Sequence, residues 1–285
     1  MTTSSLHQIG VITRLTFREA QRRRLVWIGL GLGAAFVILF TVGYYFAYQE
    51  VLRNRPQGFS QQIFVDQFSG VMLSAGLYVI NFLIIMITVL TSVGVIAGEI
   101  SSQTIHALAS KPIRRWEIVL GKWLGLATML TIYTIILSVA LMIAVRVIGG
   151  YTANNPLPAL GILVLEGLTV LSVTLLGSSL MSTLANGVVI FMLYGVAFVG
   201  GWVEQIGTMA GSDTARNLGI ASSLLMPSEA LWRYAASLLQ SSGLLGAISP
   251  FSTVSQPTPA FVAYAGVYVV ALLGAAMWAF SRRDF

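Results

Sequence analysis

Six long apolar stretches constrain the fold of this sequence more than any other feature. A helix needs about 20 mostly apolar residues to cross the hydrocarbon core of a bilayer. The stretches that qualify are residues 25–47, 71–97, 123–148, 159–183, 187–204 and 260–280. A turn at residues 184–187 must separate the fourth from the fifth, because one helix formed from both would be too long to cross once. The sequence therefore predicts an all-α integral membrane protein, a single transmembrane domain over residues 1–285 with six transmembrane helices.

Composition supports this class and excludes several kinds of site. Hydrophobic residues make up 56% of the chain and charged residues 9%, whereas charged residues make up about a quarter of a soluble domain. The chain cannot cover its surface with polar groups, so lipid must be its solvent. It has no cysteine and only two histidines, which excludes disulfides, thiolate nucleophiles and a zinc cluster. We expect no metal site.

The distribution of basic residues predicts the orientation. With the N-terminus in the cytoplasm, 11 of the 16 lysines and arginines lie on the cytoplasmic side and 5 on the other, as the positive-inside rule requires. The basic excess is then a topology signal, and no nucleic-acid partner is expected. We predict a multi-pass protein of the cytoplasmic membrane of a prokaryote, with both termini in the cytoplasm and the lipid bilayer as its surroundings.

Two segments outside the spans carry helical signals. Residues 1–24 place Arg14, Arg18 and Arg22 at four-residue spacing, which is typical of an amphipathic helix lying on the inner leaflet. A topology signal without a further role explains these arginines equally well. Residues 205–259 form the only sizeable external loop, and within it residues 227–240 begin with Pro-Ser-Glu, a helix start signal. We predict short external helices here, tucked against the outer leaflet.

Residues 98–122 interrupt the apolar pattern between the second and third spans. Apolar residues recur at helical spacing from Ile100 to Leu108, and Pro112 then ends this helix and suits the first turn of the next one. The next helix carries basic residues at the membrane surface and enters the membrane through Lys122. Further along, Gly121 and Gly125 form a small-xxx-small pair that permits close helix packing. We predict a short cytoplasmic helix, a bend and a basic hinge.

This segment resembles a motif in the permease subunits of ABC-2 type transporters. The matching residues are Gly98 and Glu99 after the second span, Thr104, residues 108–113 (LASKPI), Arg115, and residues 120–122 (LGK) at the start of the third span. The last six residues, 280–285 (FSRRDF), and the six-span layout are similar to the family as well. Residues 226–231 (MPSEAL) are similar to the branch associated with multicopper-enzyme maturation.

The resemblance implies a division of labour between subunits. In this family two permease protomers, identical or similar, form the pore, and two separate ATPase subunits bind ATP and Mg²⁺ beneath them. The segment after the second span would be the coupling helix that sits on the ATPase. The residues at or near that contact would be Glu99, Thr104, Ile105, His106, Leu108, Lys111, Pro112, Arg114 and Arg115.

The chain itself lacks the sequence signature of an ATPase. It contains no G-x-x-x-x-G-K-S/T phosphate loop. We therefore expect no enzymatic activity and no cofactor bound by this chain. The family resemblance implies export as the direction of transport.

Few charged residues lie within the spans, and such residues are functional candidates by default. Arg146 near the end of the third span and Glu166 in the fourth are of opposite sign and similar depth. We predict a structural Arg146–Glu166 pair, in preference to a substrate contact for Glu166, because unpaired charge at that depth is expensive.

Two other functions stay open. One is a secondary transporter, which is disfavoured because the sequence shows no inverted repeat and no broken mid-membrane helix. The other is a membrane scaffold that uses a partner's ATP to transmit force and moves no cargo.

Overall fold

The described part of the chain is helical throughout and contains no strand. The computed structural model describes residues 3–53, 61–98, 114–239 and 257–282. The helices in these ranges are α1 (Thr3–Arg22), α2 (Arg24–Arg53), α3 (Gln61–Ser92), α6 (Arg115–Gly149), α7 (Pro156–Leu180), α8 (Thr183–Met209), α9 (Asp213–Leu225), α10 (Ser228–Leu239) and α12 (Pro259–Ser281). Six of them, α2, α3, α6, α7, α8 and α12, are long and apolar enough to cross a membrane. The prediction of an all-α membrane protein with six transmembrane helices is confirmed.

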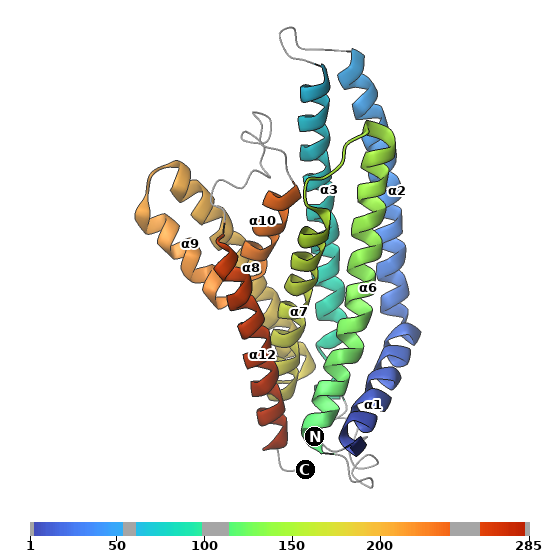
Figure 1. Ribbon diagram of the computed structural model, residues 1–285. Helices are drawn as coiled ribbons and strands as arrows, with labels where there is room; N and C mark the ends of the chain where they lie inside the picture. The colour runs from blue at the N-terminus through green and yellow to red at the C-terminus, as the bar shows by residue number, and fades with distance from the viewer. Residues whose placement is uncertain (1–2, 54–60, 99–113, 240–256, 283–285) are drawn as a thin grey trace.

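The long helices form an upright bundle (Figure 1). The helices α2, α3, α6 and α7 run side by side, α12 packs against α7 and α6, and α8 forms a hairpin with α9 that leans away from the others. The starts of α1 and α6 and the end of α12 lie at one end of the bundle, which we call the base. The connection between α6 and α7 lies at the opposite end, the top. The chain therefore returns to the base after each pair of long helices.

The turn between α7 and α8 lies at Met181 and Ser182, so the predicted turn at residues 184–187 was wrong. Met181 and Ser182 have extended backbone, with ψ of 167° and 157°. The Asn-Gly pair that suggested a turn lies inside α8. Its Asn186 side chain donates a hydrogen bond to the carbonyl oxygen of Val93 on the neighbouring chain segment. This tertiary contact outweighs the turn preference of an Asn-Gly pair.

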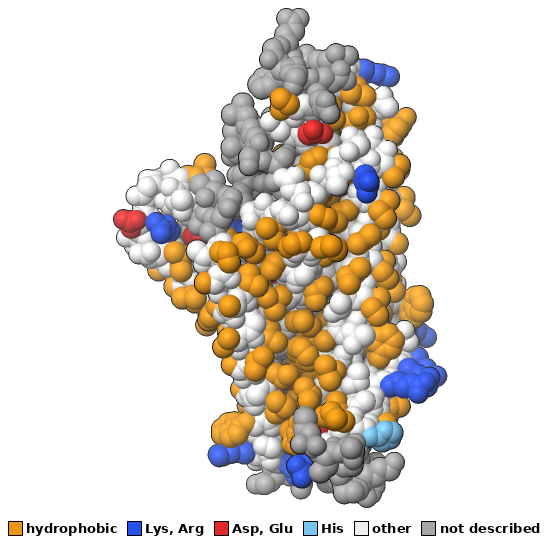
Figure 2. Space-filling model, in the orientation of Figure 1, with side chains coloured by type: hydrophobic (Ala, Val, Ile, Leu, Met, Phe, Trp, Pro, Cys, Tyr) orange, Lys and Arg blue, Asp and Glu red, His pale blue; other side chains and the backbone are white. Residues whose placement is uncertain are grey.

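Large apolar side chains cover the outside of the bundle. Figure 2 shows them as a broad band across the middle of the molecule, with charged side chains gathered toward the two ends. Leu39 on α2 and Leu184 and Met192 on α8 are among the most exposed. Apolar surface of this extent is rare on soluble monomers and fits a protein whose sides are covered by lipid.

The helix α10 is packed inside the bundle, whereas the sequence suggested a helix tucked against the outer leaflet. Trp232 and Arg233 are only 4% and 1% exposed. The Trp232 ring lies 5.2 Å from the ring of Tyr78 on α3. Arg233 forms an ion pair with Glu204 of α8, which allows a charged side chain to be buried there.

The break between α9 and α10 is stabilised by two tyrosines of α12. Because α9 ends at Leu225, its last carbonyl groups have no partners within the helix. The Tyr264 hydroxyl donates to the Leu224 carbonyl at 2.6 Å, and the Tyr268 hydroxyl donates to the Leu225 carbonyl at 2.7 Å. The last span thereby holds the end of α9 in place.

Candidate functional site

The candidate site lies at the base, where α3 ends and α6 begins. Of the residues that the family resemblance places at the ATPase contact, Arg114 and Arg115 belong to the described part of the chain, and both side chains are exposed. The others lie outside the described residues: Glu99, Thr104, Ile105, His106, Leu108, Lys111 and Pro112. The geometry of the site therefore comes from the two helix ends that flank residues 99–113.

The start of α6 is fixed by a hydrogen-bonded cap. Arg114 has extended backbone (φ −75°, ψ 138°), and its carbonyl accepts a hydrogen bond from the Glu117 amide at 2.9 Å. In return, the Arg114 amide donates to Glu117 Oε2 at 3.1 Å. A glutamate at this position of a helix is the acidic half of a capping box. The cap sets the direction in which α6 begins and leaves the Arg114 and Arg115 side chains at the surface.

The end of α3 departs from regular helix geometry. The α-helix stops at Ser92, and residues 93–96 form a turn. The Val95 amide bonds to the carbonyl three residues back, at Ser92, and the Gly98 amide bonds to Gly94. Such a break frees backbone groups that need other partners, because lipid offers none.

Three polar side chains from three other helices satisfy these freed groups, and we call them the clasp: Lys122 of α6, Ser178 of α7 and Asn186 of α8. Lys122 Nζ donates to the Val95 carbonyl at 2.9 Å. Asn186 Nδ2 donates to the carbonyl of Val93 at 3.0 Å. All three clasp residues are at most 6% exposed.

The hydroxyl of Ser178 accepts two hydrogen bonds in the clasp. The amides of Ile96 and Ala97 each donate to Ser178 Oγ at 3.1 Å. Asn186 adds a second bond of its own, from Nδ2 to the Thr174 carbonyl on α7 at 3.0 Å. The end of α3 is thus tied to α6, α7 and α8 at one level of the bundle.

The clasp was not predicted from the sequence. Lys122 was expected at the point of membrane entry and Asn186 in a turn, and Ser178 was assigned no role. The available signal was a polar residue within or beside an apolar run at each position, because such residues in spans need partners. Nothing in the sequence identifies the partner backbone groups.

The helix α1 lies across the first turns of α6 at Gly121 and Gly125. A Cβ atom at Gly121 would lie 2.7 Å from Ile12 Cβ, and one at Gly125 would lie 2.8 Å from the Thr13 carbonyl oxygen. A side chain at either position would have to displace α1. Ile12 is buried in this contact, while Arg14 and Arg18 of α1 are exposed. One face of α1 is therefore committed to α6, and the basic face stays free to meet other charges.

The structure does not bring Arg146 and Glu166 together, and the predicted pair is corrected accordingly. Glu166 is fully buried and its Oε1 accepts a hydrogen bond from Asn81 Nδ2 of α3 at 2.9 Å. Arg146 lies in the last turn of α6 with an exposed side chain. One side chain is exposed and the other is fully buried with an amide partner, so the expected ion pair does not form.

The buried ion pair of the described residues joins Arg233 of α10 to Glu204 of α8 at 2.6 Å. Glu229 lies one turn before Arg233 on the same helix. Burial raises the pKa of Glu229 to about 7, and the negative charge of Glu204 also raises it, while the nearby Arg233 lowers it. Gly201 of α8 leaves no room for a Cβ atom beside the Glu229 side chain. This cluster couples α10 to α8 through charge as well as packing.

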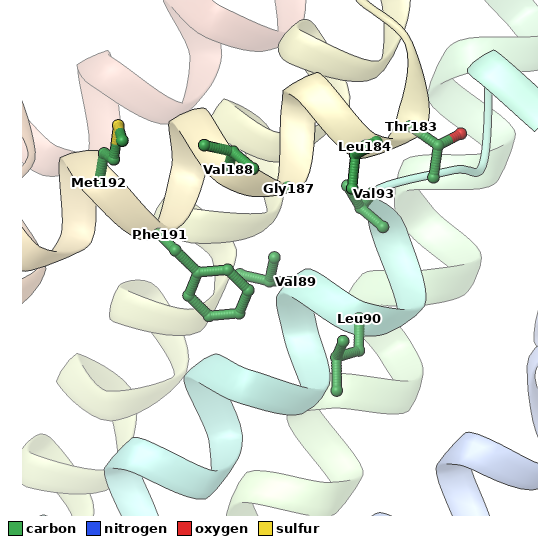
Figure 3. A pocket seen from close by; sticks show the side chains of 9 residues that line it. All are labelled: Val89, Leu90, Val93, Thr183, Leu184, Gly187, Val188, Phe191 and Met192. Carbon is green, nitrogen blue, oxygen red and sulfur yellow. The ribbon is translucent and has the colours of Figure 1, made fainter.

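An apolar groove of about 740 Å³ opens on the side of the bundle between α3 and α8 (Figure 3). The side chains that line it are Val89, Leu90, Val93, Thr183, Leu184, Gly187, Val188, Phe191 and Met192. Val93 and Thr183 place one end of the groove beside the clasp. Its apolar lining fits hydrocarbon rather than a polar substrate.

Within the described ranges, no group of three or more His, Cys, Asp or Glu side chains could hold a metal ion. The contacts at the base join helices to one another through backbone groups. Such an arrangement can transmit movement between helices.

Comparison with known proteins gives one family-level match. A family model described as "ABC-2 family transporter protein" matches residues 11–285. None of the curated proteins compared with the chain matches it significantly.

Proposed function

Because the chain belongs to the ABC-2 family of transporter proteins, we propose that it is the membrane permease subunit of an ATP-driven exporter. The observation that carries this proposal is the extent of the family match, which runs from residue 11 to the last residue. It includes all six long helices and the whole of residues 98–122. The chain is then a transport component, and hydrolysis of ATP takes place on a separate partner.

In the proposed complex two permease protomers, identical or similar, associate with two ATPase subunits that bind ATP and Mg²⁺. Residues 99–113, with Arg114 and Arg115, form the contact with the ATPase. The exposure of both arginines at the capped start of α6 supports this role. Closure of the ATPase pair around ATP moves this segment and reorients the spans.

The proposed orientation places the base in the cytoplasm of a prokaryotic cell. The helix α1, which carries several arginines, and the end of α12, which carries Arg282, lie toward the base in Figure 1, and the positive-inside rule assigns such an end to the cytoplasm. Arg282 lies over the ring of Trp278 there, 4.4 Å from its centre, an arrangement typical of a membrane–water interface. Both termini are then cytoplasmic.

The cargo class and the family branch are parts of the same proposal. The spans carry few charged side chains, which favours a hydrophobic or amphipathic cargo. Residues 226–231, with Glu229 buried at the start of α10, support membership of the branch associated with multicopper-enzyme maturation.

Purification of the tagged chain under gentle conditions from its native membrane tests the proposal. We expect an ATPase with a phosphate-loop motif to co-purify in stoichiometric amount. Its recovery should be lost in the double variant Arg114→Glu/Arg115→Glu, because two positive charges that attract acidic groups of the partner would be replaced by negative charges that repel them.

The variant Arg216→Glu provides a matched control. Arg216 is also exposed, but it lies in the first turn of α9, away from the base. It should retain the ATPase. A wild-type preparation that contains no ATPase, even in milder lipid conditions, would favour a secondary transporter or a scaffold instead.

A further inference from the structure

We propose that the clasp is the transmission point of this transporter: Lys122, Ser178 and Asn186 fix the end of α3 to α6, α7 and α8, so that a movement of residues 99–113 passes directly into α7 and α8. This inference rests on the proposed function, because it assumes that a partner moves that segment. It adds the residues through which the movement travels.

The break in α3 changes how the end of this helix is connected to the bundle. A helix that continued to the base would carry a push along its own axis and would need no side-chain partners. Here the α-helix ends at Ser92, and the backbone of Val93, Val95, Ile96 and Ala97 is bonded to other helices instead. These bonds therefore connect the end of α3 to α6, α7 and α8, in addition to the connection along the chain itself.

The clasp also joins the chain on the two sides of residues 99–113. Lys122 belongs to α6, the helix that follows the segment, yet its Nζ bonds to Val95 on the helix that precedes it. The same stretch of α6 is held by α1 at Gly121 and Gly125. The described residues on the two sides of 99–113 are consequently held to each other.

The side chain of Asn186 connects α7 and α8 to the end of α3. Asn186 bonds to Val93 and to Thr174 of α7, and Gly177 makes room for the Asn186 amide, because a Cβ atom there would occupy the same space. The α7–α8 turn and the α3 break are therefore joined directly through Asn186. Figure 3 shows Val93 and Thr183 on opposite helices at the end of the groove next to this unit.

The absence of cysteine from the sequence allows the clasp to be replaced by a removable covalent link. A Cβ atom at Gly94 would lie 3.8 Å from Thr183 Cβ, which matches the usual Cβ–Cβ separation of a disulfide, about 3.8 Å. The double variant Gly94→Cys/Thr183→Cys should therefore form a disulfide between the α3 break and α8 on oxidation. Reduction reverses it.

The experiment uses the complete complex with its co-purifying ATPase in lipid nanodiscs. Hydrogen exchange of α8 is measured by mass spectrometry with and without a non-hydrolysable ATP analogue. In the wild-type complex the analogue should change the exchange of α8. In the clasp variant Ser178→Ala/Asn186→Ala this change should be lost, while the ATPase still binds.

The matched control is Ser172→Ala/Thr208→Ala. Ser172→Ala removes two hydrogen bonds of its hydroxyl, one to the Leu168 carbonyl and one from Trp123 of α6, and Thr208→Ala removes the bond to the Glu204 carbonyl; none of these involves the end of α3. This control should keep the nucleotide response, which separates loss of transmission from a general loss of packing.

Addition of the disulfide to the clasp variant should restore the response of α8 under oxidising conditions and lose it again on reduction. The disulfide in the otherwise wild-type chain should leave the response intact, because the α3 break and α8 already move together. Where the clasp variant fails to fold, the oxidised wild-type chain still tests the inference, because loss of its response would contradict it.

Each adverse result has a distinct meaning. A wild-type complex without any nucleotide response in α8, or without an ATPase, overturns the proposed function and the inference with it. A normal response in the clasp variant, or loss of the response in the oxidised wild-type chain, overturns the inference alone.

Discussion

Replacement of Arg233 by methionine should destabilise the protein far more than replacement of its partner Glu204 by glutamine. Arg233 is the cation of the buried cluster in α8 and α10, with Glu204 Oε2 at 2.6 Å and Glu229 one turn away. Both side chains of the ion pair are nearly inaccessible, at 2% and 6% exposure. Solvent screening therefore offers little compensation when one partner is removed.

The expected magnitudes follow from what each variant leaves behind. Arg233→Met leaves two buried carboxyl groups without a cation, and removal of one partner of a buried pair costs about 3–5 kcal/mol. Glu204→Gln leaves Arg233 near the charge of Glu229 and with an amide oxygen as acceptor, so the cost should be that of a weakened buried hydrogen bond, about 1–3 kcal/mol. The difference between the two variants should be about 2 kcal/mol.

Thermal unfolding of the purified protein in detergent at about pH 8, one unit above the pKa of Glu229, measures this difference. Arg216→Met on the exposed surface of α9 serves as the control and should lie within about 0.5 kcal/mol of wild type. Equal destabilisation by Arg233→Met and Glu204→Gln would refute the reasoning, because it would mean that Glu229 does not interact with the guanidinium group.

Three further predictions follow from the same contacts. The pKa of Glu229 rises from 4.5 to about 7 on folding, so between these values the folded protein binds more protons than the unfolded one. This group therefore makes the free energy of unfolding fall by about 3 kcal/mol as the pH rises through that window. Unfolding of Glu229→Gln across the same pH range should lack this component, and an unchanged pH profile would contradict the prediction. Gly125→Leu should displace α1, because the new side chain meets the Thr13 carbonyl, and should destabilise the protein by about 1–3 kcal/mol. Increased proteolysis of α1 is the readout. The control Gly266→Leu on α12, where nothing lies within 4 Å, should be tolerated. Asn81→Leu should cost about 1–3 kcal/mol by leaving Glu166 without its amide donor, whereas Arg146→Gln at an exposed position should change stability by less than about 0.5 kcal/mol; the reverse order of these two effects would restore the Arg146–Glu166 pairing.

The sequence was sufficient to predict the number and approximate place of the spans. The length requirement of a bilayer applies to each helix separately, so it can be read from one stretch at a time. The helix ends were less accurate, because α2 and α3 extend beyond their apolar stretches to Arg53 and from Gln61. Hydrogen bonding continues a helix into polar sequence that hydropathy does not count.

Contacts between distant residues were not predictable in the same way. Glu166 pairs with Asn81, 85 positions earlier, rather than with a charge of opposite sign at similar depth. Which partner a side chain meets depends on the rotation of each helix about its axis, and the apolar residues that surround these spans on all sides do not define that rotation. The same reason explains why the sequence suggested a peripheral position for α10 and did not identify the partners of the clasp residues.

The glycines that join α8 to α9 bear on how the chain is assembled in the membrane. A Cβ atom at Gly207 or Gly219 would meet backbone atoms of the opposite helix within 2.7 Å. With 13 residues, α9 is too short to cross a bilayer, which needs about 20. It therefore keeps its place as the second arm of a hairpin with α8. Because Gly219 lies against the Glu204 backbone, the closeness of this hairpin also fixes the position from which Glu204 reaches Arg233 of α10.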